Sequence, residues 1–148
     1  MSDIHLNFLK KNELQSFVSV LSSYNVDSWL ISGDIGESSS VIYLLDFLSD
    51  NLTQPIYFVL GNHDFYRSSL SKTTDAVKKH VENNPQLIWL TWAEYQNLGS
   101  GVALVGDDGW GDARLGNAFG TSILLNDFFF IQKLWVTFYL IVLQLIRK

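Results

Sequence analysis

The sequence alternates amphipathic helical stretches with short apolar runs, and this alternation most constrains its fold. The two clearest runs cover residues 28–32 and 56–60, and they end at Gly33-Asp34 and at Gly61-Asn62. Apolar runs of this length are typical of buried strands, and strands joined through helices pair in parallel. We therefore predict an α/β fold in which parallel strands are flanked by helices. Because such sheets bind ligands at the carboxyl ends of their strands, both polar loops are predicted to lie at a ligand-binding edge.

The remaining elements follow from apolar spacing and from residues that begin or end helices. Apolar side chains recur at helical intervals from residue 12 to about 23, and again from Val41 to Leu48 after serines that suit an N-cap. A third helical stretch ends at Asn84-Pro85, because proline disfavours a helix before it. The predicted helices are 12–23, 41–48 and 67–83, and the further predicted strands are 87–90 and 102–105.

Composition limits the class of protein. The chain has 148 residues, of which 47% are hydrophobic, enough for one globular domain with a buried core. Its net charge of -5 suits cations and argues against an extended nucleic-acid surface. No cysteine is present, which excludes disulfides and thiolate metal sites. Since the N-terminus also shows no signal-peptide pattern, we expect a cytoplasmic protein.

The polar loops carry side chains that bind hard metal ions. In the Asp3-Ile4-His5 motif, the two polar residues would point to one side of an extended chain, so an oxygen and a nitrogen can reach one ion. Asp34 adds a carboxylate, and the Gly61-Asn62-His63-Asp64 motif adds an amide oxygen and a histidine. The first two motifs have simpler explanations, a solvated loop and a turn. The third is too long to be expected by chance in one chain of this length.

The order of these three motifs resembles the N-terminal half of the calcineurin-like metallophosphoesterases. The resemblance implies a pair of divalent cations, such as Mn, Fe or Zn ions. Asp3 and His5 would belong to the first cation and Asn62 to the second, with Asp34 bridging both. It also implies a phosphoester hydrolase, in which a metal-bound hydroxide attacks a small phosphomonoester or phosphodiester.

Two residues of the third motif are predicted to take part in protonating the leaving group. In the family, the histidine at the position of His63 contacts the phosphate and protonates the leaving group, which suits a side chain with a pKa of about 6.5. Asp64 follows it directly, and we expect its carboxylate to orient the His63 ring. The alternative is that His63 is a surface residue without a catalytic role.

Two departures from the family pattern lead us to expect a truncated domain. Only two residues precede Asp3, so most of a central strand is missing, which would expose a strand edge and loosen Asp3. The family pattern continues with a lone histidine and Gly-His-x-His, whereas the histidines here are His5, His63 and His80, the last expected on a solvated helix face. We therefore expect residues 1–132 to form a partial metallophosphoesterase domain with one occupied metal site. A non-catalytic remnant that binds a metal ion or phosphate is the alternative function.

A loop from residue 106 to 114 is a candidate substrate-binding element. It follows the predicted strand 102–105 and combines glycines and aspartates with Trp110 and Arg114. We expect Arg114 to meet the phosphate and Trp110 to flank the organic part of the substrate. A glycine-rich turn without a ligand is the alternative.

The segment 133–148 is an atypical apolar end of the chain, expected to be helical. After Lys133 it is apolar on every helical face up to Ile146. Three interpretations remain: a buried helix, a membrane-associated segment, or an aberrant end in place of the family's helix, which we favour. Membrane contact is expected only through this segment, and it would make the protein a membrane-associated interaction module.

Overall fold

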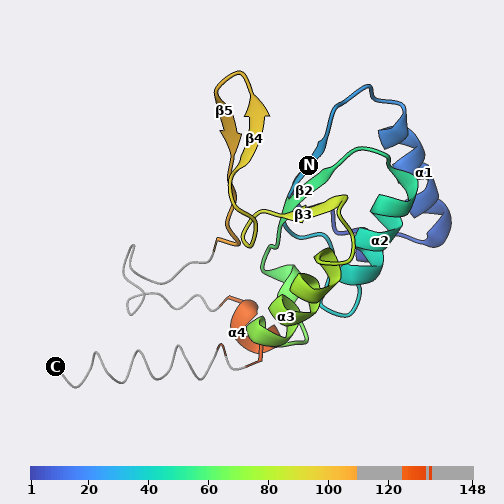
Figure 1. Ribbon diagram of the computed structural model, residues 1–148. Coiled ribbons are helices and arrows are strands. Elements are labelled where there is room, and N and C mark those ends of the chain that lie inside the picture. The colour runs from blue at the N-terminus through green and yellow to red at the C-terminus, as the bar shows by residue number, and fades with distance from the viewer. Residues whose placement is uncertain (110–124, 133, 135–148) are drawn as a thin grey trace.

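The protein is built on a three-stranded parallel sheet with helices packed against it (Figure 1). The computed structural model describes residues 1–109, 125–132 and 134. The strands are β1 (Trp29–Ser32), β2 (Ile56–Val59) and β3 (Leu87–Trp89), in the spatial order β1-β2-β3. Helix α1 (Lys11–Ser22) precedes β1, α2 (Val41–Asn51) connects β1 to β2, and α3 (Leu70–Val81) connects β2 to β3. The predicted α/β fold is confirmed.

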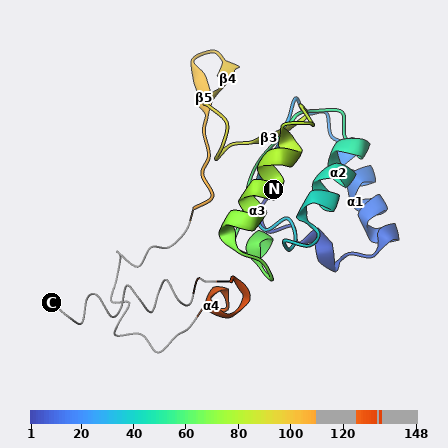
Figure 2. The same ribbon diagram turned by 60° about the horizontal axis from the view of Figure 1, so that its bottom comes forward.

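The three helices form one layer, with α2 between α1 and α3 (Figure 2). Gln15 of α1 donates a hydrogen bond to Asn51 of α2 at 3.4 Å, and Asn84, just after α3, donates one to Ser49 of α2 at 3.0 Å. Both polar contacts are made by residues in the last turn of α2. The layer follows from the connectivity, because successive right-handed crossovers in one direction place their helices on the same face.

The sheet is held by rows of large apolar side chains that cross all three strands. Ile31 of β1 is paired with Phe58 of β2, which is paired with Trp89 of β3, and each of the three is at most 3% exposed. Burial of a side chain of this size contributes about 2 kcal/mol. Alternate residues such as Leu30 are exposed on the other face, so these strands are buried on one side rather than on both.

The N-terminal residues extend the sheet at the outer edge of β1. The Met1 ammonium donates to the Leu30 carbonyl oxygen at 2.6 Å, and the Ser32 amide donates to the Met1 carbonyl oxygen at 2.8 Å. The Asp3 amide donates to the Gly33 carbonyl oxygen at 3.3 Å. We expected an uncovered strand edge, whereas the hydrogen bonds of Met1 occupy part of the edge of β1.

A small antiparallel hairpin projects from the body of the molecule (Figure 1). It consists of β4 (Gln96–Gly99) and β5 (Val102–Leu104). The prediction of a strand at 102–105 is confirmed for three of its residues, but this strand belongs to a separate two-stranded sheet. The strand β4 was not predicted, because its polar sequence has no apolar pattern.

The described end of the chain packs beside the start of α3 through a short helix, α4 (Asp127–Phe130) (Figure 1). The Arg67 amide donates to the Phe130 carbonyl oxygen at 2.7 Å, and Ile131 is 2% exposed. The predicted apolar helix at 133–148 lies outside the described residues, apart from Leu134. Among the residues that the structure describes, no helix has the length and apolarity needed to cross a membrane.

Candidate metal centre

The carboxyl ends of β1 and β2 border a hollow of about 500 Å³. Asp34 follows β1 and Asn62 follows β2, while Asp3 reaches the hollow from the N-terminal segment. Its other described lining residues are Ser32, Val59, Leu60, Gly61, Asp107, Gly109, Leu125 and Asp127. Three predicted metal ligands thus share one site at the predicted edge of the sheet.

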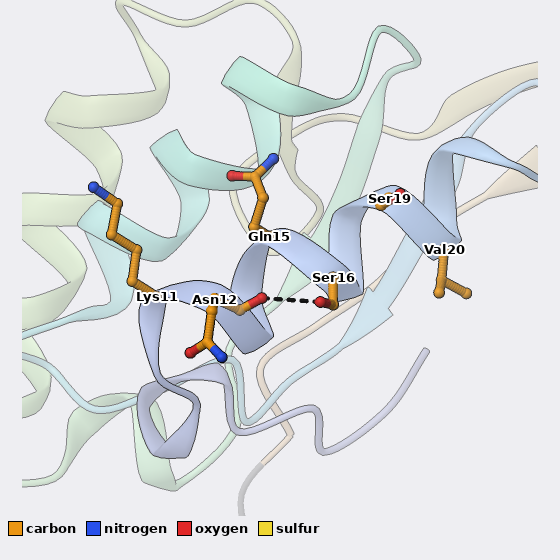
Figure 3. A pocket seen from close by; sticks show the side chains of 6 residues that line it. All are labelled: Lys11, Asn12, Gln15, Ser16, Ser19 and Val20. Carbon is orange, nitrogen blue, oxygen red and sulfur yellow. Dashed lines mark hydrogen bonds between the residues drawn. The ribbon is translucent and has the colours of Figure 1, made fainter.

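A larger hollow of about 910 Å³ lies along α1, with its lining side chains drawn in Figure 3. The residues are Lys11, Asn12, Gln15, Ser16, Ser19 and Val20. All belong to one helix, and the hydrogen bond drawn there, from Ser16 Oγ to the Asn12 carbonyl oxygen at 3.0 Å, is internal to that helix. This surface contains no converging acids or histidines, so the smaller hollow is the candidate functional site.

The two histidines of the motifs lie against each other beside Asp34. His5 Nε2 is 3.7 Å from Asp34 Oδ2, and the His5 and His63 rings meet edge to face with centroids 4.7 Å apart. One potential ligand atom from each of His5, Asp34 and His63 lies within 4.8 Å of the other two. Sequence reasoning placed His63 outside the metal ligands, whereas its position also allows it to bind a cation.

Backbone strain is concentrated at the same residues. Asp3, His5 and Asp34 have φ values of 51°, 41° and 52°. This left-handed conformation costs roughly 1–2 kcal/mol for a residue with a side chain. Strain of this kind persists where the surrounding contacts enforce it, and it is common at functional sites.

Glycine is required where the loops after β1 and β2 touch. Gly33 has a φ of 88°, and a Cβ built on it would lie 2.7 Å from the Gly61 amide nitrogen. A Cβ on Gly61 would overlap the carboxylate of Asp34. The absence of side chains at both positions therefore lets Asp34 sit directly on the neighbouring loop, where its Oδ1 also accepts a hydrogen bond from the His63 amide at 3.0 Å.

Asp64 lies buried between the two loops of the site. Its carboxylate is fully buried and accepts hydrogen bonds from the Gly36 amide at 2.8 Å and the Gly61 amide at 2.9 Å. Burial raises the pKa of Asp64 to about 6, and the backbone hydrogen bonds oppose that rise. The oxygens of Asp64 thus tie the two site loops together through their amides, and its role in orienting the His63 ring stays a prediction.

Sequence reasoning missed two residues of the site, Tyr66 and Asp127. Asn62 Nδ2 donates to Asp127 Oδ1 at 2.8 Å, and the Tyr66 hydroxyl donates to the same oxygen at 2.7 Å. The Tyr66 ring also stacks on His63, with centroids 4.3 Å apart. Burial, and then the Asp127 carboxylate, raise the pKa of Tyr66 well above its usual value. Tyr66 was detectable as a residue one helical turn after Asn62, but no local signal in the sequence marks Asp127.

The first part of the 106–114 loop is fixed at the border of the hollow by Asp108. Its Oδ1 accepts hydrogen bonds from the Leu60 amide at 2.6 Å, Thr91 Oγ1 at 2.6 Å and Trp89 Nε1 at 3.0 Å. Burial raises the pKa of Asp108, while these hydrogen bonds lower it. The loop therefore reaches the site as predicted, but Trp110 and Arg114 lie outside the described residues.

The third histidine is remote from the hollow and is not solvated as expected. His80 Nε2 lies 2.9 Å from Asp46 Oδ1 of α2, and its side chain is 21% exposed. The atoms are close without the alignment of a hydrogen bond, since His80 Nε2 has no hydrogen-bond partner. The expected solvated helix face is corrected because α2 packs over this part of α3.

The donor set fits a divalent cation. Metal–nitrogen and metal–oxygen bonds of about 2.1 Å allow ligands on opposite sides of an ion to be about 4 Å apart, close to the spacing of the histidine and Asp34 atoms. The Nδ1 atom of His5 is buried without a hydrogen-bond partner. Imidazole and carboxylate groups together suit Zn, Fe and Mn ions.

Comparison with known proteins identifies the pattern to which these residues belong. A family model described as calcineurin-like phosphoesterase matches residues 1–137. No curated protein and no solved structure gives a significant match.

Proposed function

The chain belongs to the calcineurin-like phosphoesterase family, and from this premise we propose that it hydrolyses a small phosphomonoester or phosphodiester with a bound divalent cation. This family is one of metal-dependent phosphoester hydrolases. The convergence of His5, Asp34 and His63 at the sheet edge supports the proposal. No other group of three such residues occurs in the part of the chain that the structure describes.

The charge of the hollow supports a requirement for metal. Its described lining includes four carboxylates, on Asp3, Asp34, Asp107 and Asp127, and no lysine or arginine. A phosphate would be repelled from this surface unless cations compensated its charge. A bound divalent cation supplies that positive charge and promotes the ionisation of water near neutral pH.

The residues divide into a metal-holding group and a proton-transferring group. His5 and Asp34 would hold the first cation, with Asp3 beside them and Asn62 directed toward a second one. His63 would meet the phosphate and deliver a proton from a ring nitrogen to the leaving oxygen. Its contacts with His5 and Tyr66 limit the rotation of the ring, which favours a fixed direction for that transfer.

Hydrolysis of an aryl phosphate with added Mn²⁺ tests the proposal. We expect metal-dependent turnover in the wild type, a loss of at least about 100-fold in His63→Ala, and loss of both Mn²⁺ binding and turnover in Asp34→Asn. His80→Ala is the matched control, because His80 lies beside Asp46 of α2 and is not part of the group formed by His5, Asp34 and His63. Retained turnover in His63→Ala would contradict its proposed role.

Binding without turnover would point to another function. If the wild type binds Mn²⁺ and hydrolyses no aryl phosphate monoester or diester, a non-catalytic metal-binding remnant is favoured. If Mn²⁺ does not bind at all, the proposed function is wrong.

A further inference from the structure

The Asp127 carboxylate connects the end of the described chain to the centre of the site. Asp127 is 8% exposed, and backbone hydrogen bonds hold the residues that follow it. The Arg67 amide donates to the Phe130 carbonyl oxygen at 2.7 Å, and the Gln132 amide donates to the Ser68 carbonyl oxygen at 2.7 Å. These backbone contacts hold the first turn of α4 against the segment that follows the third motif.

The hydrogen bonds of Asn62 define which way its amide faces. Its Nδ2 donates to Asp127 Oδ1 at 2.8 Å and to the Tyr66 hydroxyl at 3.2 Å. An ionised carboxylate can only accept a hydrogen bond, so Asp127 pairs with the nitrogen of the amide and not with its oxygen. Reversal of the amide would place its oxygen against the carboxylate oxygen. The Asn62 carbonyl oxygen is therefore directed away from Asp127.

We propose that Asp127 is a positioning residue, which fixes the Asn62 amide with its oxygen available to a cation and holds Tyr66 against His63. The benefit to metal binding rests on the proposed function. Groups that orient metal ligands typically change metal affinity 10–100-fold when they are removed.

Mn²⁺ affinity, measured by electron paramagnetic resonance, tests the benefit to metal binding. We expect Asp127→Ala to bind Mn²⁺ about 10-fold or more weakly. Asp127→Asn should remain within a few-fold of the wild type, because its carbonyl oxygen still accepts from Asn62 and Tyr66. Asp75→Ala, which removes an exposed carboxylate on α3, should leave the affinity unchanged. Equal affinity of Asp127→Ala and the wild type would overturn the proposal.

A second measurement on the metal-free protein separates this inference from the proposed function. The side-chain amide protons of Asn62, assigned by their disappearance in Asn62→Ala, should exchange with water more slowly than those of exposed Asn12. Asp127→Ala should abolish that protection, and Asp127→Asn should restore it. Unprotected Asn62 protons in the wild type would refute the positioning role, even if Mn²⁺ binds and turnover is observed. Protection without any Mn²⁺ binding would support the positioning role and contradict the proposed function.

Asp127→Leu controls for destabilisation of the fold by the cavity that alanine leaves. Leucine has a similar side-chain volume to aspartate but lacks the oxygen that accepts from Asn62 and Tyr66. If Asp127→Ala does not fold, Asp127→Leu replaces it in both experiments. The positioning role predicts loss of Asn62 protection in Asp127→Leu and rescue in Asp127→Asn. Protection in Asp127→Leu equal to that of the wild type would overturn it.

Discussion

The site loops and the β4–β5 hairpin both use glycine with a positive φ, but for different physical reasons. Gly33, in the loop after β1, has a φ of 88°, and an added Cβ would meet the backbone of Gly61. Gly99 and Gly101, in the hairpin, have φ values of 84° and 77°, and an added Cβ would meet nothing within 4 Å. Glycine in the hairpin serves the turn alone, whereas glycine at the site also allows two loops to touch.

Buried polar groups make the same distinction between the two regions. The loops of the site are held by the carboxylates of Asp64 and Asp108. Asp64 accepts from the distant Gly36 as well as from nearby Gly61, and Asp108 accepts from Leu60 and Trp89, both distant in the sequence. In the hairpin, the Asn97 side chain accepts from the Gly99 amide at 2.9 Å, which is a contact within the turn. Changes at the site loops should therefore alter stability and ligand binding together, and changes in the hairpin should alter neither by much.

The largest expected effect is that of Gly61→Ala. The new methyl group would displace the Asp34 carboxylate. We therefore expect the free energy of unfolding to fall by about 3 kcal/mol and Mn²⁺ binding to be lost. Urea denaturation and Mn²⁺ titration measure the two effects. Gly109→Ala is the matched control, because Gly109 lines the same hollow but a Cβ there would meet no described residue within 4 Å. Similar losses of stability and Mn²⁺ binding in the two variants would contradict the claim that steric contact at Gly61 causes them.

The next effect is that of Asp108→Ala. It would leave three donors, on Leu60, Thr91 and Trp89, without their acceptor, which is expected to destabilise the protein by about 2–3 kcal/mol. Asp108→Asn should recover part of that loss, because its carbonyl oxygen can accept in place of the carboxylate oxygen. Chemical denaturation measures both, and a loss below about 0.5 kcal/mol in Asp108→Ala would show that this loop is no better anchored than the hairpin.

Asp64 makes the stability of the site loops depend on pH. Its pKa is about 6 in the folded protein, against 3.8 for a free aspartate side chain, so the folded state takes up the proton at a higher pH than the unfolded state does. Protonation therefore stabilises the fold as pH falls from 7 to 4, and this contribution is lost as pH rises through 6. Relative to Asp64→Asn, the metal-free wild type should gain about 2 kcal/mol over this interval. Thermal denaturation at several pH values measures the difference, and a constant gap between the two proteins would contradict this prediction.

The smallest effect belongs to the hairpin. In Gly101→Ala the alanine must adopt a left-handed conformation, but its methyl group overlaps no described residue. We therefore expect the free energy of unfolding to fall by about 1 kcal/mol or less. Gly101→Asn should lose less still, since asparagine adopts this conformation more readily. Mn²⁺ affinity should be unchanged in both variants. A change in affinity would show that the hairpin is coupled to the site.

The local sequence predicted the regular elements well and their ends less well. The helix expected from residue 12 to 23 is observed at Lys11–Ser22, and the strand expected at 56–60 is observed at Ile56–Val59. The helix expected from Arg67 begins only at Leu70, because Arg67 has a φ of 66° and Ser69 caps the helix by accepting from the Lys72 amide. Spacing reveals which residues face the core, but it does not reveal where a tertiary contact bends the chain.

Candidate ligands were recognisable before the fold was known, because they follow strands whose carboxyl ends meet at one edge. Asp3, Asp34 and Asn62 line one hollow for this reason. The partners of these residues were not recognisable. Asp64, for example, accepts hydrogen bonds from backbone amides of two loops, which its place in the third motif did not reveal.

The sequence by itself determined the parallel α/β framework and the chemical types of the groups at its edge, since both follow from local periodicity and motif order. The tertiary structure alone decided which groups meet. Asp127 contacts Asn62 across 65 residues of sequence, and His63 lies against His5 across 58 residues. Hydrogen bonds and ring contacts at such separations depend on how the intervening helices pack, and no short stretch of sequence contains that information.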